Sequence, residues 1–552
     1  MQADLWFKNA VVYSLDVETF MDANGDGCGD FEGLSRRLDY LDGLGVDVLW
    51  LTPIQPTPNR DDGYDISDYY GVDTRLGSSG DFIEFVHDAA SRGIRVVVDL
   101  VVNHTSDRHA WFQQARRDRD SPYRDWYVWS KRRPRNWRSG MVFPGAQDAT
   151  WTFDREAREY YFHRFYAFQP DLNMENPHVR EEVRRVMGFW LQLGVAGFRV
   201  DAVPFVLEEP PRSSRKAKVH FEYLREMREF LQWRVGDAIL LGEANVPPEE
   251  SGRYFAGDDG LHMMFNFWVN QHLFYALASG DARPLAAALR ATHRIPAQAQ
   301  WAHFLRNHDE LDLGRLSPEH KATVIEAFGP AAAMQLYDRG IRRRLGPMLG
   351  DRRRIELAYS LLFSLPGTPM LRYGEEIGMG ENLRLKERAA IRTPMQWSAE
   401  RNAGFSTAEQ LVRPVVDDGL FGYESVNVEA QRRDPDSLLR WLIRLIRVRK
   451  ECPEIGWGGW QIVTTGSRHV LALAHEWRGN VVVCVHNLDA EPHEAVLRLE
   501  RAERLTSLTD DEASDADGSG RHRLALEPYG YRWYRAGDLD YALRRESGLV
   551  RG

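Results

Sequence analysis

Cysteine is scarce in this sequence, with only Cys28, Cys452 and Cys484 among 552 residues. The three are too widely separated to form a metal-ligand motif or a disulfide framework, which favours a reducing compartment. No apolar run reaches the length of about 20 residues that a membrane span requires. The N-terminal segment MQADLWFKNAVVY lacks the basic and apolar regions of a signal peptide. We therefore expect a cytoplasmic protein with no membrane partner.

Positive charge is also in short supply, because 71 Lys and Arg residues stand against 81 Asp and Glu residues, a net charge of −10. This balance argues against nucleic acid as a partner. The basic clusters at 131–138 and 340–346 are short and are interpreted as solvated faces or sites of interface salt bridges. Neither a glycine-rich phosphate loop nor a G-x-S-x-G motif precedes the expected strands, which disfavours phosphoryl transfer and serine hydrolysis.

Short apolar runs alternate with amphipathic helices along the first 450 residues. Near-continuous apolar runs of this kind are typical of parallel strands that are covered on both faces. The helix expected at 34–45 has apolar residues at the helical period, and the helix expected at 179–194 ends in glycine. Eight such units predict a (β/α)8 TIM barrel of the α/β class. The expected strands lie at 11–13, 46–51, 94–102, 197–203, 238–245, 262–267, 301–309 and 367–374.

The regular spacing of these units is interrupted twice. An irregular interval after the third strand is rich in Trp, Arg and Pro, and it predicts an inserted subdomain at 105–172. The interval 310–366 is expected to be mostly helical. After residue 450, strand-like segments separated by turn residues predict an antiparallel β-sandwich domain at 451–552. The barrel itself is then built from 1–104 and 173–450. Division into several domains is expected because the chain is too long for one hydrophobic core.

Acidic side chains stand where the expected strands end. Asp201 and Arg199 share one face of the fourth strand, while Glu243 ends the fifth and Asp309 the seventh. Reactive side chains of parallel barrels lie at these carboxyl ends. Gathering carboxylates is costly because like charges repel and burial raises their pKa values, so a shared catalytic site explains the set better than separate structural roles. An ionised carboxylate beside a protonated one can cleave a glycosidic bond with retention.

The stretch DANGDGCGD places oxygen-bearing side chains at Asp22, Asn24, Asp26 and Asp30, with glycines between them. Converging oxygens suit a hard cation such as calcium, which takes about six to eight oxygen ligands. The pattern begins like an EF-hand loop, but Gly33 stands at the position of the bidentate Glu that an EF-hand requires. A polar turn held by Asx hydrogen bonds is the alternative interpretation.

The segments DLVVNH, GFRVDAV, LGEAN and FLRNHDE resemble the four ordered sequence blocks of the α-amylase superfamily, glycoside hydrolase family 13, and QPDLN at 169–173 resembles a fifth. The resemblance covers nearly the whole chain. It implies that Asp201 is the nucleophile, Glu243 the general acid/base, and Asp309 the acid that grips sugar hydroxyls and stabilises the transition state. The implied sugar-binding residues are Asp65, His104, Arg199 and His308 at the non-reducing glucose subsite, and Arg392 near the second sugar.

The same resemblance implies calcium as a cofactor at two sites. The first would use Asp22, Asn24, Asp26 and Asp30 together with the backbone carbonyl of Cys28. The second would use Asn103, Asp171 and Glu208, with backbone oxygens near Phe205.

Several segments, among them QPDLNMENP, RTPMQWSAERNAGFS and YESVNVEAQ, resemble the trehalose synthase branch of the family. That resemblance implies a small-molecule substrate, maltose or trehalose, and isomerisation through a covalent glucosyl-enzyme with minor hydrolysis. An exo-acting α-glucosidase is the alternative, because the same chemistry hydrolyses its substrate when water enters the site. A non-catalytic binding domain is a distant third, since all three acids are present. Whether the chain forms a homo-oligomer stays open.

Overall fold

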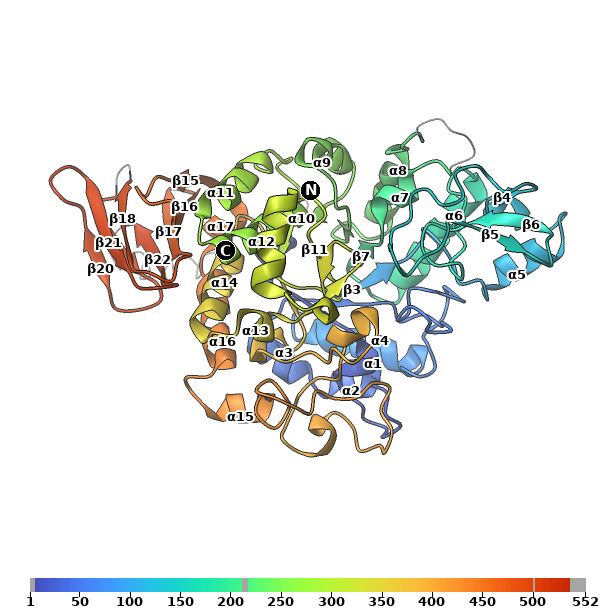
Figure 1. Ribbon diagram of the computed structural model, residues 1–552, viewed down its shortest axis with the longest axis horizontal. Coiled ribbons are helices and arrows are strands. Elements are labelled where there is room, and N and C mark those ends of the chain that lie inside the picture. The colour runs from blue at the N-terminus through green and yellow to red at the C-terminus, as the bar shows by residue number, and fades with distance from the viewer. Residues whose placement is uncertain (1–4, 211–216, 500–501, 537–552) are drawn as a thin grey trace.

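Eight parallel strands close into a barrel at the centre of the computed structural model, which describes residues 5–210, 217–499 and 502–536 (Figure 1). Around the barrel the strand order is β1-β14-β10-β9-β8-β7-β3-β2. Each expected strand is present, so the predicted fold class is confirmed. The strands are β1 Val12–Leu15, β2 Val48–Leu51, β3 Arg95–Leu100, β7 Gly197–Val200, β8 Ile239–Gly242, β9 Met263–Phe265, β10 Gln300–Phe304 and β14 Thr368–Arg372.

Helices connect these strands, and local residues set their ends. Ser78 and Asp81 form a capping box at the start of one helix, and Asn176 caps the helix that begins at Pro177. The helix predicted at 34–45 is wrong as a single element. The chain forms two short helices there, because Arg37 leaves helical dihedrals with φ −106° and ψ 4°.

The longer helices are α4 Ser79–Ser91, α6 Pro177–Gln192, α8 Glu222–Arg234, α10 Phe267–Ser279, α11 Ala282–Ala291, α12 Pro318–Phe328, α14 Arg352–Ser364 and α16 Leu438–Lys450. The shorter ones are α1 Val17–Phe20, α2 Phe31–Ser35, α3 Leu38–Leu44, α5 Ala110–Arg117, α7 Val203–Leu207, α9 Pro248–Phe255, α13 Leu345–Leu349, α15 Val428–Arg433 and α17 Pro453–Trp457. No helix of the described ranges combines the length and the apolar character needed to cross a membrane.

Two insertions rise from the carboxyl ends of the barrel strands. After β3, the strands β4 Trp129–Ser130, β5 Trp151–Asp154 and β6 Glu159–Phe162 form a small antiparallel sheet around a core of Val128, Trp151 and Phe162. The interval 310–366 contains α12, α13 and α14, and it adds a three-stranded sheet of β11 Leu311–Asp312, β12 Gln335–Leu336 and β13 Gly340–Ile341. Backbone segments from both insertions therefore border the barrel mouth.

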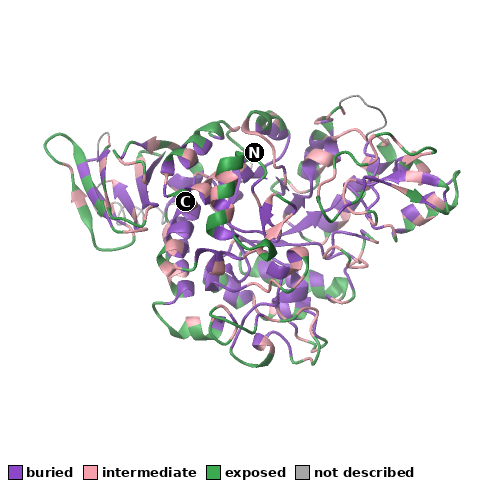
Figure 2. Ribbon diagram, in the orientation of Figure 1, coloured by how far each residue is buried: buried purple, intermediate pink, exposed green. Residues whose placement is uncertain are grey.

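A two-layered β-domain follows α17. One sheet has the order β15-β16-β17-β22-β19-β20, and β18 pairs with β21 in a second. In Figure 1 this domain and the β4–β6 sheet lie at opposite ends of the long axis, with the barrel between them. Figure 2 shows how burial concentrates in the barrel strands and in the inward residues of the β-domain. The predicted span 451–552 includes residues 500–501 and 537–552, which lie outside the described ranges. Its strands are β15 Gly459–Val463, β16 Val470–Trp477, β17 Asn480–Asn487, β18 His493–Arg498, β19 Arg504–Ser507, β20 Ala513–Asp515, β21 Arg521–Leu526 and β22 Tyr531–Ala536.

Candidate active site

Three acidic side chains from different barrel strands line one cavity of about 590 Å³. Asp201 directly follows β7, Glu243 directly follows β8, and Asp309 lies five residues beyond β10. Parallel barrel strands bring their carboxyl ends to one face, so residues far apart in sequence meet there. The structure thus brings together the three acids predicted from the sequence.

Arg199 on β7 joins two of these acids through a single guanidinium. Its Nη1 lies 2.7 Å from Oδ1 of Asp99 and 2.6 Å from Oδ1 of Asp201, and its Nη2 lies 2.7 Å from Oε2 of Glu243. β7 has β3 on one side and β8 on the other, so an inward side chain on β7 reaches both. The planar fork of arginine can bond several carboxylates at once, which a lysine ammonium in the same position would not match.

Burial and Arg199 act in opposite directions on the two carboxyl groups. Burial raises the pKa of Glu243 to about 7, against the opposing effect of Arg199. Burial also raises the pKa of Asp201 to about 6, again opposed by Arg199. Near neutral pH, Asp201 is therefore mainly ionised while a large fraction of Glu243 keeps its proton. A pair with this difference offers a nucleophile and a general acid in one cavity.

Asp309 is held ionised by two arginines and a histidine beside it, of which only the arginines are cations, because burial lowers the pKa of His308 well below its usual range. Its Oδ1 accepts hydrogen bonds from Arg388 at 2.9 Å and from Arg392 at 2.8 Å, and Nε2 of His308 lies 3.3 Å from its Oδ2. Burial alone would raise the pKa of Asp309, but His308 and the two arginines outweigh burial and hold the pKa well below its usual range. A fixed carboxylate of this kind can accept bonds from sugar hydroxyls and stabilise developing positive charge.

Aromatic and imidazole rings form another part of the cavity wall. The Tyr64 and His308 rings stack with centroids 5.4 Å apart, and the Tyr64 hydroxyl lies 2.8 Å from Nε2 of His308. That hydroxyl also donates to Oδ2 of Asp99 at 3.1 Å. Nε2 of His104 lies 2.9 Å from the Tyr64 carbonyl oxygen. His104 and His308, both predicted site residues, line the cavity beside Tyr64, which sequence reasoning missed.

The structure corrects the predicted position of Asp65. Its side chain is fully buried and does not line the cavity, because its Oδ1 accepts bonds from the Thr57 hydroxyl at 2.9 Å and from the backbone N–H of Arg60 at 3.1 Å. Asp61, four residues earlier, lines the cavity instead. The adjacent acids Asp61 and Asp62, directly before Gly63, were the feature of the sequence that could have indicated Asp61 as a cavity residue.

Arg392 is corrected in the same way, since it does not line the cavity. It is buried behind Asp309, where it also contacts Asp62 and donates to the His308 carbonyl oxygen at 2.7 Å. Arg199 likewise stands behind the acids rather than among the lining residues. The arginines that line the cavity are Arg315, Arg339 and Arg388, and Nη2 of Arg388 lies 2.7 Å from Oδ1 of Asp61. The only feature of the sequence that pointed to Arg388 was its position four residues before Arg392.

Comparison with known protein families agrees with this arrangement. The catalytic domain of α-amylase matches residues 16–342 and 341–458. The chain belongs to the α-amylase family. A second match, to the C-terminal domain of sucrose hydrolase-like proteins, covers residues 479–535. The family assignment predicted from the sequence blocks is therefore confirmed.

Individual members of the α-amylase family extend the comparison. The chain is 43% identical to a trehalose synthase of Thermus thermophilus over 98% of its length, although it spans only 57% of that relative. It is 40% identical to a trehalose synthase of Pimelobacter, with 97% and 96% of the two chains covered. An oligo-1,6-glucosidase of Parageobacillus thermoglucosidasius is 34% identical, with 88% and 90% covered. A crystal structure of a trehalulose synthase variant superposes with a TM-score of 0.77 at 27% identity, covering 96% of this chain and 100% of the other.

At the cavity rim, side chains from three segments meet in what we call the rim cluster, which comprises Phe143, Tyr166, Tyr337 and Glu387. Phe143 lines the cavity, and its ring lies 5.0 Å from Tyr166 and 4.7 Å from Tyr337. Both tyrosine hydroxyls donate to Oε2 of Glu387, at 2.7 Å and 2.9 Å. The cluster thus joins the insertion after β3 to the 310–366 segment and to the loop that carries Arg388.

The 22–30 loop is held by Asx hydrogen bonds. Oδ1 and Oδ2 of Asp22 accept from the backbone N–H groups of Gly25 and Gly27, and Oδ2 of Asp30 accepts from that of Ala23. Asn24 and Asp26 each accept from the N–H two residues on. All of these side-chain oxygens face the loop's own backbone. This arrangement is the polar turn held by Asx hydrogen bonds, which was the alternative to a calcium site. The oxygen-only donor set also fits a calcium ion, which would take over some of these contacts.

The second predicted calcium set also lies together. Asn103 hydrogen-bonds the side chain of Asp171, and the backbone N–H of Arg164 donates to Oδ1 of Asp171 at 2.8 Å. Burial raises the pKa of Asp171 to about 7. Nη2 of Arg164 lies 2.6 Å from Oε2 of Glu208. Arg164 therefore bonds Asp171 through its backbone and Glu208 through its guanidinium, which supplies positive charge beside the two carboxyl groups.

Proposed function

We propose that this member of the α-amylase family isomerises maltose to trehalose by retaining glucosyl transfer. The observation that carries the proposal is the Arg199 guanidinium, which holds Asp201 and Glu243 on its two amino groups. Retaining enzymes need their two carboxyl groups about 5 Å apart, whereas inverting enzymes leave room for a water. A shared guanidinium favours the closer spacing. The relatives named trehalose synthase support the choice of substrate.

The residues divide the reaction into two displacements. The Asp201 carboxylate attacks the anomeric carbon of the non-reducing glucose as the glycosidic bond breaks, and Glu243 gives its proton to the leaving oxygen. Glucose is released as a neutral molecule while the glucosyl group stays on Asp201. The glucose then turns, Glu243 takes the proton of its anomeric hydroxyl, and that oxygen attacks the same carbon. Asp201 leaves as a carboxylate, and trehalose forms.

Exclusion of water decides the product of the second displacement. If water attacks the glucosyl group on Asp201, glucose is the only product, as in an exo-acting α-glucosidase. The rim cluster supports isomerisation because it links both insertions across the barrel mouth. Asp61 and Arg388 pair beside Asp309 and offer hydrogen-bonding groups for a sugar in the cavity.

The decisive experiment is incubation of the purified chain with maltose and radiolabelled free glucose, followed by chromatography of the products. We expect trehalose as the main product with little label, since the released glucose does not exchange with solution. An Asp201→Asn variant, which keeps the shape of the side chain, should form neither product. Glucose without trehalose would reject the isomerase and favour the α-glucosidase.

We further propose calcium as a cofactor, bound by Asp22, Asn24, Asp26, Asp30 and the Cys28 carbonyl, and at a second site by Asn103, Asp171 and Glu208. The support is the oxygen-only composition of both sets. The buried free cysteines support a reducing, cytoplasmic location.

Calcium binding can be tested by thermal unfolding with and without a chelator. Binding to the folded state raises stability by mass action, so the chelator should lower the Tm by a few degrees, and added calcium should restore it. An Asp26→Asn variant should reduce the response, while Asp39→Asn, on an exposed carboxyl, should not. The same Tm with chelator and with calcium would contradict the proposal.

A further inference from the structure

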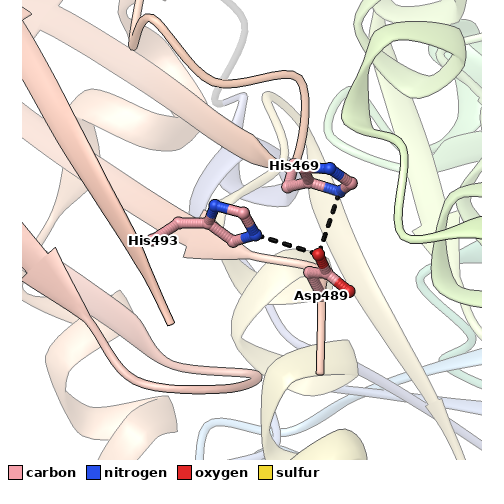
Figure 3. A group of neighbouring side chains, drawn as sticks. All are labelled: His469, Asp489 and His493. Carbon is pink, nitrogen blue, oxygen red and sulfur yellow. Dashed lines mark hydrogen bonds and ion pairs between the residues drawn. The ribbon is translucent and has the colours of Figure 1, made fainter. Parts of the chain in front are cut away.

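A group of metal-binding side chains lies outside the catalytic cavity, in the C-terminal domain. It consists of His469, Asp489 and His493, which Figure 3 shows converging on one carboxylate. Nε2 of His493 lies 2.9 Å from Oδ2 of Asp489, and Nδ1 of His469 lies 3.3 Å from the same oxygen. One ligand atom from each residue lies within 4.8 Å of the others. The proposed reaction uses none of these groups.

The group lies at the seam between the C-terminal domain and the barrel. His469 directly precedes β16, Asp489 follows β17, and His493 begins β18. Nδ1 of His469 lies 2.6 Å from the carbonyl oxygen of Gly280, the residue that ends α10. A bond from the Ala282 N–H to the Arg468 carbonyl at 2.8 Å joins the same two segments. An ion bound here would therefore link the barrel turn to the β-domain.

We propose that His469, Asp489 and His493 bind a zinc ion. Zinc takes imidazole nitrogen and carboxylate oxygen in tetrahedral sites with bonds of about 2.0–2.2 Å, which places ligand atoms about 3.4 Å apart. The two distances to Oδ2 of Asp489 are already close to that spacing. Two imidazoles in a set of three favour zinc over calcium or magnesium, which prefer oxygen ligands. The three side chains are each between 20% and 27% exposed, so an ion can enter from solvent.

The hydrogen bonds of His469 show which contacts the ion would replace. Nδ1 of His469 faces two acceptors, the Gly280 carbonyl and the Asp489 carboxylate. Nδ1 must therefore carry a proton or bind a metal ion. Nε2 accepts a bond from Nε of Arg468 at 3.1 Å, which places the proton on Nδ1 in the metal-free chain. Zinc binding would release that proton and require another on Nε2, and the exposed Arg468 side chain would move away. The Gly280 carbonyl or a water would complete the coordination.

Other zinc ligands in the described ranges are weaker competitors. The cysteines are buried, and burial raises the pKa values of Cys28 and Cys452 to about 12, which disfavours the thiolate that binds metal. A second group, Glu175, Glu209 and His220, has only one imidazole. Both of its ring nitrogens already contact carboxylates, Glu209 at 3.1 Å and Glu222 at 2.6 Å. His220 therefore provides a control.

The test is calorimetric titration of the full chain with zinc, in saturating calcium and after chelator treatment. We expect a single equivalent to bind, and His493→Ala to weaken the affinity at least tenfold while activity on maltose is unchanged. His220→Ala should leave the titration as it is. Arg468→Gln should tighten binding severalfold, because it removes a like charge beside the ion. Equal zinc affinity in the His493→Ala variant and the unchanged chain, or no zinc binding at all, would overturn the proposal.

Cobalt(II) gives a readout that does not depend on how the variants fold. A tetrahedral cobalt site with nitrogen and oxygen ligands absorbs strongly in the visible, whereas hydrated cobalt absorbs weakly. We expect the unmutated chain to develop these bands with a single equivalent of cobalt, and zinc to remove them. A spectrum no stronger than that of hydrated cobalt would count against the site.

Discussion

Arg199 is the residue on which the catalytic geometry depends most directly. It contacts Asp99, Asp201 and Glu243 within 2.6–2.7 Å and is almost completely buried. Buried carboxylates repel one another unless a cation lies between them, and removing that cation would leave the charges unpaired. The guanidinium therefore permits two acids with different pKa values to share one cavity.

We predict that Arg199→Lys lowers kcat on maltose by about 100-fold, the scale observed when one preorganised donor is removed from an active site. The ammonium cannot bond Asp201 and Glu243 at once, so their spacing and protonation are no longer coordinated. Steady-state kinetics on the purified variant would measure the loss. Arg36→Lys, on an exposed i,i+4 pair with Glu32, is the matched control and should stay near full activity. Retention of most activity by Arg199→Lys would contradict this role.

The pH dependence of kcat/KM is expected to be bell-shaped. Below about pH 6, Asp201 gains a proton and ceases to be a nucleophile, because burial raises its pKa to about 6. Above about pH 7, Glu243 loses the proton that it must donate, because burial raises its pKa to about 7. Activity should therefore fall on both sides of a narrow maximum between these values. Initial rates across the range would check this, and a flat profile through both values would disagree.

At the scale of elements, the rim cluster connects segments that lie far apart in the sequence. Tyr337 and Glu387 both have positive φ, 56° and 43°, a conformation that non-glycine residues seldom adopt. The bond between the Tyr337 hydroxyl and the Glu387 carboxylate joins these two residues, and the Tyr337 ring also packs against Phe143. The rim cluster thus joins the insertion after β3 to the 310–366 segment, as does a bond from Nη1 of Arg339 to the Val142 carbonyl oxygen at 2.7 Å.

Loosening the rim cluster should change the products more than the rate. In Tyr337→Phe the bond to Glu387 is lost while the ring remains, and Glu387→Gln replaces a charged acceptor with a neutral one. We expect each to raise the ratio of glucose to trehalose severalfold with total maltose consumption within about twofold, because water enters more often. Chromatography of the products gives the ratio. Tyr70→Phe, which removes an exposed hydroxyl bonded to Glu182, should not alter it. An unchanged ratio in both rim variants would rule out this role.

At the scale of the whole molecule, the N-terminal segment, the barrel and the C-terminal domain meet around α17. A Cβ added at Gly456 would lie 1.9 Å from the carbonyl oxygen of Lys8. Gln300 on β10 donates to the Gly456 carbonyl at 2.8 Å. Close backbone contact at this helix thus joins the first residues of the chain to the base of the barrel.

Gly456→Ala is predicted to destabilise the protein by about 1–3 kcal/mol, the usual cost of overpacking. The gain in helix propensity from Gly to Ala, about 1 kcal/mol, is smaller than the clash with a backbone atom that cannot move aside freely. Denaturant or thermal unfolding would measure the change. Gly459→Ala is the control, since no atom of the described residues lies within 4 Å of its added Cβ. Equal stability of the two variants would show that the seam can relax.

The barrel and its three acids were predictable because their pattern is local. Each strand is a short apolar run, and Asp201 and Glu243 directly follow such runs, so the parallel arrangement alone brings them to one face. The resemblance to the family could also be recognised from the sequences of these segments. The helix at 34–45 was mispredicted because apolar spacing continues across Arg36 and Arg37 although the backbone does not.

The sequence by itself determined the parallel barrel, the order of its strands and which acids stand at their carboxyl ends, because these follow from short-range apolar patterning. Tertiary structure alone decided that Asp61 and Arg388, rather than Asp65 and Arg392, face the cavity. The reason is that Asp65 is bonded within its own loop by Thr57 and Arg60, whereas Asp61 pairs with Arg388 in the cavity wall. It also decided that His469, Asp489 and His493 meet beside Gly280, since the ends of β16, β17 and β18 bring the three together and the packing of the β-domain on the barrel places His469 against Gly280.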